Sequence, residues 1–346
     1  MANTRRTVYN NICTPKKLEK INSDNIQLGE DFLDYLSSID RAKTTIDGYR
    51  ADLRIIWVLI LDLAGNKFFV EISKRDLIKI QNYCLNSLGW SPARIRRVKS
   101  TMSSLSNYVE SMLDDEFKGY RPIVRKIENP PSSTVREKTV FKNEQIQELL
   151  DYLVENKQFD KACMLALAIN SGKRKSELPR IKTSYFNEEN IIYGALYKSP
   201  ETITTKGRGS RGKLLNVYVL KKGFQPYLNL WLEYRKENNI TSEWLIPKKE
   251  NGIYVDKQTP ITTMNSWAES FTKFLGVPFY WHSLRHLFVT NLSEANIPDS
   301  VIQDIVGWDS AEMCRLYNDT PADVKFGKYF NEDGIKQVEQ GSLSKI

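Results

Sequence analysis

Apolar residues recur every three or four positions through most of the first third of the chain, a spacing typical of helices that bury one face. Ser73 and Ser91 are residue types that cap helix N-termini, Pro92 suits a first helical turn, and Gly65 is a C-cap type. Residues 25–117 therefore predict a helical domain. Its four helices are Leu28–Ile39, Thr44–Gly65, Lys74–Leu88 and one that opens at Ser91-Pro92.

From Val140 onward, helical and alternating patterns are mixed. Helical spacing spans Ile146–Val154 and Phe159–Ile169, and the strand-like runs are Ile191–Tyr197, Glu201–Thr205 and Leu214–Leu220. Helical patterns return at 225–237, 261–275, 282–295, 299–306, 310–317 and about 321–339. The chain is therefore predicted to be mainly α, with a small antiparallel β-sheet in a second domain of residues 140–330.

Three segments lack such periodicity. Residues 1–24 are polar and basic, as expected of a frayed terminus or of an arm that touches DNA. Residues 118–139 contain prolines, a serine pair and many basic residues, which predicts an extended cationic linker between the two domains. Residues 331–346 are predicted to be a C-terminal tail that includes the end of the last helix.

Composition excludes several classes of protein. The longest apolar run, Ile55–Leu61, is seven residues, whereas a membrane span needs roughly 20. No apolar segment follows the basic residues of the N-terminus, so no secretory signal is predicted. The four cysteines are scattered without a C-x-x-C pair, which favours a reducing cytoplasm and argues against a disulfide framework or a zinc site. We expect a cytoplasmic, nucleoid-associated protein with no membrane partner.

The net charge of +8 is compatible with nucleic-acid binding, and the positions of the basic residues indicate which segments would contact the nucleic acid. Cations fill the first two turns of the helix that follows Ser91, where they oppose the helix dipole, so a phosphate is a natural compensating partner. A solvated charged face is the alternative. The linker and a Gly-rich loop, Lys206–Lys213, are also strongly basic. The predicted DNA contacts are Arg94, Arg96, Arg97, Lys99, Arg121, Arg125, Lys126, Arg208 and Arg211.

The segment Trp281–Tyr317 gathers side chains of another kind. It contains both histidines of the chain, His282 and His286, with Arg285 between them and Trp308 further on. A cation, an imidazole, an indole and the phenol of Tyr317 suggest chemistry on a phosphate. A metal-binding histidine pair is the alternative, but no acid or cysteine nearby completes such a site.

Four motifs in the second domain together resemble those of a known protein family. They are G-x-R-x-S-E-L at Gly172–Leu178, H-x-L-R-H at His282–His286, the pair Gly307-Trp308, and Tyr317 nine residues after Trp308. Together, and in this order, they resemble the tyrosine recombinase or phage integrase family, of the two-domain Xer- and Cre-like type. The resemblance covers roughly residues 25–330.

The resemblance implies a site-specific recombinase that cleaves and rejoins duplex DNA through a 3′-phosphotyrosine and a Holliday junction. It also implies a C-shaped clamp of two domains, a homotetramer on two recombination sites, and a C-terminal helix that docks on a neighbour. No metal or other cofactor is implied. Integration or excision of a mobile element is the leading interpretation. Xer-like resolution of chromosome or plasmid dimers, type IB topoisomerase-like relaxation and an architectural DNA-binding role are the alternatives.

The resemblance also assigns roles. Arg174 and Arg285 would clamp the phosphate, because a guanidinium donates two parallel charge-assisted hydrogen bonds to such an anion. Tyr317 would attack the phosphorus, His282 would assist as acid or base, and Lys206 would protonate the leaving 5′-oxygen. Arg208 and Arg211, in the same loop as Lys206, are expected to contact phosphates.

The remaining positions are expected to support the site. Trp308 stands where the family most often has histidine, and its indole N–H donates a hydrogen bond but exchanges no proton. Glu177 is expected to orient the site, and His286 to pack beside it. Lys213 shares the loop with Lys206 and is the alternative general acid. Lys173 occupies a position that is usually apolar in the family, so it is expected to alter local packing or to contact DNA.

Overall fold

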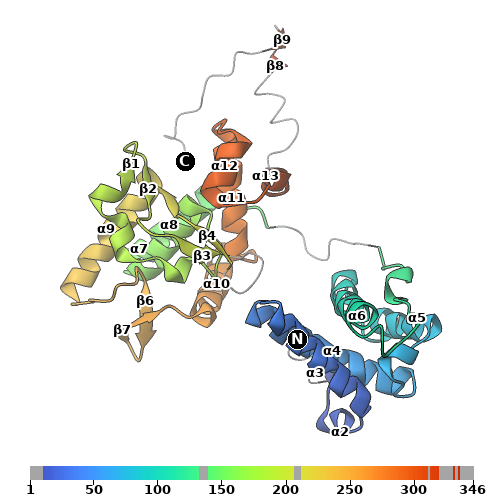
Figure 1. Ribbon diagram of the computed structural model, residues 1–346. Helices are drawn as coiled ribbons and strands as arrows, with labels where there is room; N and C mark the ends of the chain where they lie inside the picture. The colour runs from blue at the N-terminus through green and yellow to red at the C-terminus, as the bar shows by residue number, and fades with distance from the viewer. Residues whose placement is uncertain are drawn as a thin grey trace. The chain divides into compact units, whose positions relative to one another are not determined.

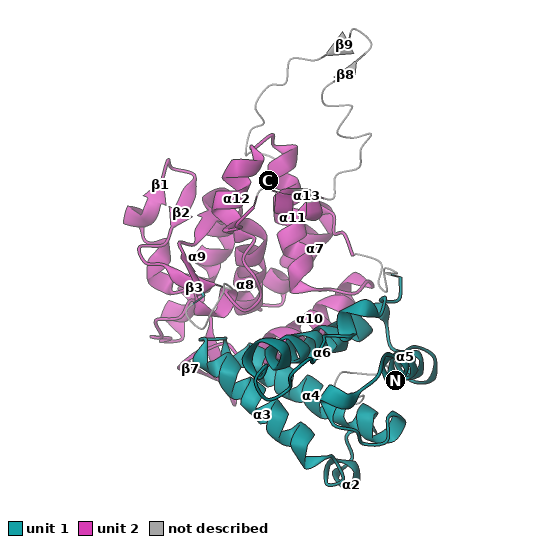
Figure 2. Cartoon of the chain, turned by 45° about the vertical axis from the view of Figure 1, so that its right-hand side comes forward, with its two compact units in different colours: residues 1–137, 206–212 teal, residues 138–205, 213–346 magenta. Residues whose placement is uncertain are grey.

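The computed structural model describes residues 11–131, 139–205, 212–310, 312–318, 330–331 and 334–335 (Figure 1). Contacts divide the chain into two compact units (Figure 2). Unit 1 runs to Glu137, and unit 2 comprises Lys138–Thr205 and the chain from Lys213 onward. The described residues are mostly helical with short antiparallel strands, which confirms the predicted fold class.

Unit 1 contains the four predicted helices and one short helix, α2, that was not predicted. Two serines cap them as expected: Ser73 forms a reciprocal capping box with Asp76, and the side chain of Ser91 accepts from the backbone N–H of Arg94. The third helix ends earlier than predicted because a π-helical turn, Tyr83–Ser87, follows it. The helices of this unit are α2 (Pro15–Leu18), α3 (Ser23–Ser38), α4 (Lys43–Leu63), α5 (Lys74–Asn82) and α6 (Pro92–Met112).

The core of unit 1 extends beyond these helices at both ends. Ile12 and Ile21 are buried in it, although residues 11–24 show no periodic pattern. Val124 is buried in the same core, and Tyr120 shares a 2.7 Å hydrogen bond with Ser106 of α6. Residues 118–131 therefore pack against unit 1, whereas the sequence predicted an extended linker there. Single apolar residues among polar ones supply this packing, so the sequence shows no periodic pattern there.

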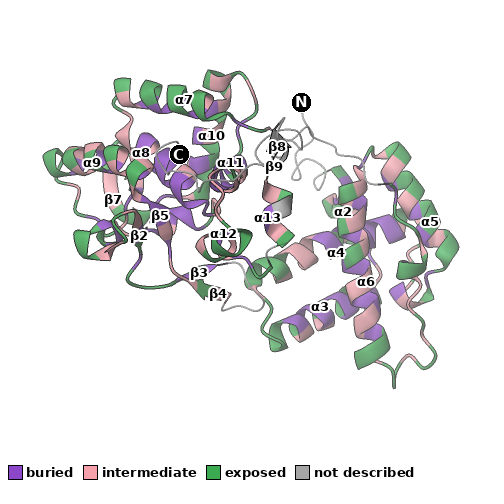
Figure 3. Ribbon diagram, turned by 90° about the horizontal axis from the view of Figure 1, so that it is seen from above, coloured by how far each residue is buried: buried purple, intermediate pink, exposed green. Residues whose placement is uncertain are grey.

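Unit 2 surrounds a central helix, α8 (Phe159–Ser171), which is buried along most of its length (Figure 3). Helices α7 (Asn143–Glu155), α9 (Lys221–Glu237) and α11 (Trp281–Glu294) pack against it. A smaller apolar cluster lies under α11, α12 (Asp299–Val306) and α13 (Glu312–Tyr317). The remaining helix, α10 (Ile261–Leu275), packs against α7.

Short 3-10 turns occur in both units. They are Phe69–Glu71 and Val124–Lys126 in unit 1, and Leu178–Arg180, Thr183–Phe186 and Glu188–Asn190 in unit 2.

The strands of unit 2 form short antiparallel pairs. Strand β2 lies between β1 and β5, with Tyr197 opposite Val219. A separate hairpin pairs β3 with β4 around the predicted Gly-rich loop, with Thr205 opposite Lys213. The single strands predicted at Ile191–Tyr197 and Leu214–Leu220 are each divided into two short strands. The loop that joins these two strands, residues 206–211, lies outside the described residues. The strands are β1 (Ile191–Ile192), β2 (Leu196–Lys198), β3 (Ile203–Thr205), β4 (Lys213–Leu215) and β5 (Tyr218–Leu220).

Two further strand pairs were not predicted. Strands β6 (Pro247–Glu250) and β7 (Ile253–Gln258) are joined at Asn251-Gly252, both with positive φ, the usual residues of a tight hairpin turn. Near the C-terminus, β8 (Phe330–Asn331) pairs with β9 (Gly334–Ile335). These four residues contradict the helix predicted at about 321–339, where Asn331 and Gly334 supply turn residue types.

Candidate active site

The first part of the candidate site is the turn that follows α8. Gly172 ends this helix with φ 58°, and a Cβ on it would lie 2.4 Å from a ring carbon of Phe288, so the position requires glycine. Two residues later, Arg174 donates to Glu177 from its backbone N–H and from Nη1, each at 2.9 Å. Glu177 is 1% exposed, whereas Arg174 is half-buried. The carboxylate therefore orients the guanidinium and leaves part of it accessible.

Arg285 is the second cation of the site and is fully buried in α11. Its Nη1 donates to the carbonyl of Gly172 at 2.8 Å, which joins α11 to the Arg174 turn. Its Nε and Nη2 have no hydrogen-bond partner among the described residues. Burial lowers the pKa of Arg285 to about 10, and Arg174 also lowers this pKa, while Glu177 and Tyr317 raise it. Arg285 therefore stays cationic at neutral pH with two donors left for an anion.

Tyr317, at the end of α13, lies against both histidines of α11. Its hydroxyl is 3.0 Å from Nε2 of His282. Its ring stacks on that of His286, with centroids 4.3 Å apart and planes at 21°. The guanidinium of Arg285 lies 5.7 Å from the centre of the Tyr317 ring. An imidazole and a cation thus flank the phenol, as a tyrosine nucleophile needs.

Trp308 completes this cluster from the end of α12. Gly307 ends that helix with φ 79°, and the N–H groups of Gly307 and Trp308 both donate to the carbonyl of Gln303. The indole ring lies 5.0 Å from the guanidinium of Arg285 and 4.8 Å from the ring of Tyr317. Its buried Nε1 has no hydrogen-bond partner within the described part of the chain. The indole N–H is therefore a further donor available to an anion.

The structure therefore brings most of the predicted site residues together. The assembled residues are Arg174, Glu177, His282, Arg285, His286, Trp308 and Tyr317. Unpartnered N–H groups beside a phenol that is hydrogen-bonded to an imidazole suit a tetrahedral anion that the phenol attacks.

Of the predicted basic site residues in the hairpin of β3 and β4, called the basic hairpin below, the structure describes one. Lys206, Arg208 and Arg211 lie outside the described residues. Lys213, the alternative to Lys206, is in β4 and forms a 2.7 Å ion pair with Asp309, the residue after Trp308. Because both side chains are solvent-accessible, this pair contributes little stability, but it links β4 to the segment that carries the indole.

Two predicted DNA contacts of unit 1 share a partner inside the protein. Arg94 and Arg97 form ion pairs of 3.2 and 2.8 Å with the two oxygens of Asp52 in α4, a carboxylate that is fully buried. The cations at the start of α6 are thus compensated by an acid in the neighbouring helix. The sequence signal for it is weak: Asp52 lies three positions before the apolar run Ile55–Leu61, with Arg54 in between. Whether either arginine also contacts DNA stays a prediction.

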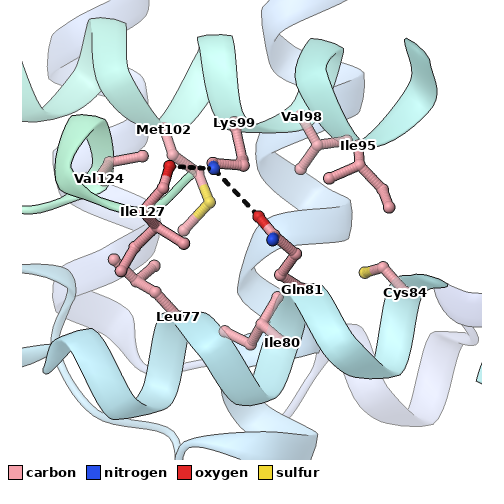
Figure 4. Close-up of a pocket in the computed structure, with 10 residues that line it drawn as sticks. All are labelled: Leu77, Ile80, Gln81, Cys84, Ile95, Val98, Lys99, Met102, Val124 and Ile127. Atoms are coloured by element: carbon pink, nitrogen blue, oxygen red, sulfur yellow. Dashed lines mark hydrogen bonds between the residues drawn. The ribbon is translucent and has the colours of Figure 1, made fainter. Parts of the chain in front are cut away.

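Lys99 and Arg96 bind backbone carbonyls of the segment that follows α6. Lys99 donates to Ile127 at 2.6 Å and to Gln81 at 3.0 Å, at the edge of a cavity of about 20 Å³ between α5 and α6 (Figure 4). Burial lowers the pKa of Lys99. Arg96 donates to the carbonyl of Pro130 at 2.8 Å. Such a cavity holds one water at most, so it is a packing gap and no ligand site.

The other predicted contacts of unit 1 are exposed. Arg121, Arg125 and Lys126 lie at the surface of the segment that packs on the core through Val124. Their accessibility fits a contact with a phosphate backbone, which stays a prediction. Within the described ranges, no three His, Cys, Asp or Glu side chains are grouped to hold a metal ion, and no helix is long and apolar enough to cross a membrane.

Comparison with known proteins identifies the family of this chain. The model of the phage integrase family matches residues 139–322, more than half of the chain. The SPbeta prophage-derived recombinase-like protein YomM of Bacillus subtilis is 29% identical over 261 residues, which cover 75% of this chain and 74% of that protein. Tyrosine recombinase XerA of Pyrococcus horikoshii is 25% identical over 306 residues, which cover 86% and 90% of the two chains.

Solved structures share the fold. A lambda integrase tetramer bound to a Holliday junction matches with a TM-score of 0.61 and 14% identity, covering 85% of this chain and 76% of that one. The Tn1549 transposon integrase in complex with transposon right end DNA also has a TM-score of 0.61 and 14% identity, covering 87% and 97%. The chain belongs to the phage integrase family, and it is a tyrosine recombinase, an enzyme that breaks and rejoins DNA strands.

Proposed function

We propose that the protein is a site-specific recombinase that integrates or excises a mobile element, through a 3′-phosphotyrosine intermediate and a Holliday junction. The observation that carries this proposal is the set of unpartnered donors around the phenol. Nε and Nη2 of Arg285 and Nε1 of Trp308 lack partners among the described residues, while the hydroxyl of Tyr317 lies 3.0 Å from His282. A phosphodiester supplies the acceptor oxygens that these donors need, and a phosphorus atom for the phenol to attack.

In the cleavage step, the phenol oxygen of Tyr317 forms a bond to the phosphorus, and the bond from phosphorus to the 5′-oxygen breaks. His282 accepts the phenol proton, since its Nε2 is already within hydrogen-bond distance. Arg174 and Arg285 hold the non-bridging oxygens, and Trp308 donates its indole N–H. Glu177 fixes Arg174, and His286 packs against the nucleophile. The energy of the broken bond is kept in the phosphotyrosine, so rejoining by a 5′-hydroxyl needs no nucleotide cofactor.

The proton for the leaving 5′-oxygen comes from Lys206 in this proposal. The ion pair between Lys213 and Asp309 favours Lys206 over Lys213, because the ammonium of Lys213 already has a carboxylate partner. Arg208 and Arg211, in the same loop, contact neighbouring phosphates. Exchanging Lys206 or Lys213 separately for methionine tests this assignment. Only the Lys206 variant should lose the cleavage rate and recover it on DNA with a better leaving group, such as a 5′-bridging phosphorothiolate.

The proposed partner is a duplex recombination site, held between the two units as in a C-shaped clamp, with four protomers on two sites. The exposed cations Arg121, Arg125 and Lys126 would contact its backbone. Because such contacts release counterions, binding should weaken steeply with added salt. The C-terminal residues would dock on a neighbouring protomer, and the protein would act on DNA in the cytoplasm.

A mobile element is favoured by the prophage origin of the relative YomM, which its name states. Xer-like resolution of dimers is the second candidate, because the XerA relative spans more of the chain. Footprinting on DNA of the host and its elements would identify the bound site. A supercoiled plasmid that carries two such sites should then yield deletion or inversion products. Relaxation of a plasmid that lacks the site, without recombinants, would instead show topoisomerase-like activity.

A further inference from the structure

Lys173 is a buried lysine at the centre of the candidate site. It stands between Gly172, whose carbonyl holds Arg285, and Arg174, and it is 2% exposed. Lysine is almost never buried to this extent unless it is paired, because removing an ammonium from water is costly. The sequence predicted altered packing or a DNA contact at this residue. Arg285 and Trp308 are as deeply buried but keep N–H groups without a partner among the described residues, whereas the ammonium of Lys173 is taken up by backbone carbonyls, so Lys173 acts inside the protein.

The ammonium of Lys173 reaches two backbone carbonyls from different elements. Nζ lies 3.3 Å from the carbonyl of Ile305 in α12 and 3.4 Å from that of Asn216, between β4 and β5. The charged groups around it are Glu177, Arg285 and Arg174. Within the described residues it forms no ion pair, so Glu177 acts on it only at a distance. Burial lowers the pKa of Lys173 to about 8, and Glu177 partly opposes this effect.

The two carbonyls belong to the segments that border the site. Ile305 lies three residues before Trp308, and β4, which precedes Asn216, is the second strand of the hairpin whose loop carries Lys206. These segments also contact each other, because a Cβ on Gly307 would lie 2.2 Å from Leu215 of β4. Lys173 is therefore the point where the Arg174 turn, the basic hairpin and the Trp308 segment meet.

We propose that Lys173 is a positioning residue, which ties the backbone of the hairpin and of α12 to the turn that carries Arg174. It thereby sets the distances between Arg174, Arg285 and Trp308 around the scissile phosphate. The inference rests on the proposed strand-cleavage function and deepens it. A methionine of similar length would fill the same space without an ammonium to desolvate, so the lysine lowers stability and is retained for a function.

The test compares Lys173→Met with Lys236→Met, which makes the same chemical change at an exposed position in α9. Each protein is assayed for DNA affinity, for single-turnover cleavage at saturating enzyme, and for thermal unfolding. We expect Lys173→Met to cleave about 10- to 100-fold more slowly, as misplaced reacting groups do. Its affinity should stay within about twofold and its unfolding temperature should not fall, because the lysine neither contacts DNA nor stabilises the fold. Lys236→Met should match the wild type.

A second readout tests whether Lys173 acts through the phosphate clamp. A methylphosphonate at the scissile position lacks the negative charge that Arg174 and Arg285 hold. On this substrate the ratio of wild-type to Lys173→Met rates should shrink, whereas a general structural defect would leave the ratio unchanged.

Four results would overturn the inference: a wild-type cleavage rate in Lys173→Met, loss of affinity equal to loss of rate, an unchanged ratio on methylphosphonate, or unfolding of both Lys173→Met and Lys173→Leu. If the wild-type protein itself forms no adduct, the proposed function fails instead, so the two failures are distinguishable.

Discussion

Replacing Lys173 with methionine should stabilise the protein at neutral pH and change how its stability depends on pH. Burial takes the pKa of this ammonium from its ordinary 10.5 to about 8 in the folded protein. This lowering of the pKa by roughly 2.5, at about 1.4 kcal/mol per pKa unit, corresponds to about 3.5 kcal/mol. Lys173→Met removes this penalty and should raise the free energy of unfolding at pH 7 by an amount of that order.

The direction of the pH effect follows from proton binding. Between about pH 8 and 10.5 the unfolded chain keeps the proton on Lys173 while the folded protein loses it. Because the unfolded state then binds more protons, the free energy of unfolding of the wild type rises with pH across this window. The penalty is fully present below pH 8 and disappears toward pH 10.5. The advantage of Lys173→Met should therefore be largest at pH 7 and should narrow above pH 8.

Urea unfolding followed by tryptophan fluorescence is a suitable assay, since Trp231, Trp244, Trp267, Trp281 and Trp308 all lie in unit 2. Wild type, Lys173→Met and Lys236→Met are unfolded at several pH values from 7 to 10. All other ionisable groups are shared, so their contributions cancel in the difference. A pH-independent difference, or a variant less stable than wild type at pH 7, would refute the reasoning.

Three further substitutions test other parts of the structure. Gly307→Ala should destabilise the protein by about 1–3 kcal/mol, because the new Cβ meets Leu215 at 2.2 Å; Gly65→Ala, at a similar φ of 67° but in open space, should cost less in thermal unfolding. An equal loss of stability in Gly307→Ala and Gly65→Ala would contradict the close contact between Gly307 and Leu215. Asp52→Asn should lower stability by about 2 kcal/mol, since two arginine ion pairs lose their buried charge, and salt should not restore it. Arg285→Lys should slow cleavage at least about 100-fold with little change in affinity, because an ammonium lacks the guanidinium fork; a rate near wild type would refute the clamp.

The sequence predicted the elements whose signal is local. The four helices of unit 1 follow from apolar spacing and from caps such as Ser73 and Ser91, and the hairpin of β3 and β4 follows from alternation around a Gly-rich loop. The hairpin of β6 and β7 also carried a local signal, Asn251-Gly252, between strands that are largely polar and show little alternation. The motif residues were predicted by family resemblance, and the fold brings the described ones into contact.

What the sequence did not predict depends on partners that are distant along the chain. Arg94 and Arg97 looked free for DNA because Asp52, their counterion, is more than forty positions away. Lys173 was expected to alter local packing or to contact DNA, and only the carbonyls of Asn216 and Ile305 beside it reveal where its ammonium lies. Periodicity records which face of an element is buried, whereas the charge partner of a side chain is set by tertiary structure.

The most direct test of the account is the covalent intermediate. DNA that carries the footprinted site, nicked just downstream of the scissile phosphate, loses its short 5′-hydroxyl fragment after cleavage and traps the enzyme. Wild-type protein should give a denaturant-resistant protein–DNA adduct, and Tyr317→Phe should give none while binding DNA equally well. An adduct that persists undiminished in Tyr317→Phe, or no adduct from wild-type protein bound to its own site, would contradict the assignment of Tyr317 as the nucleophile.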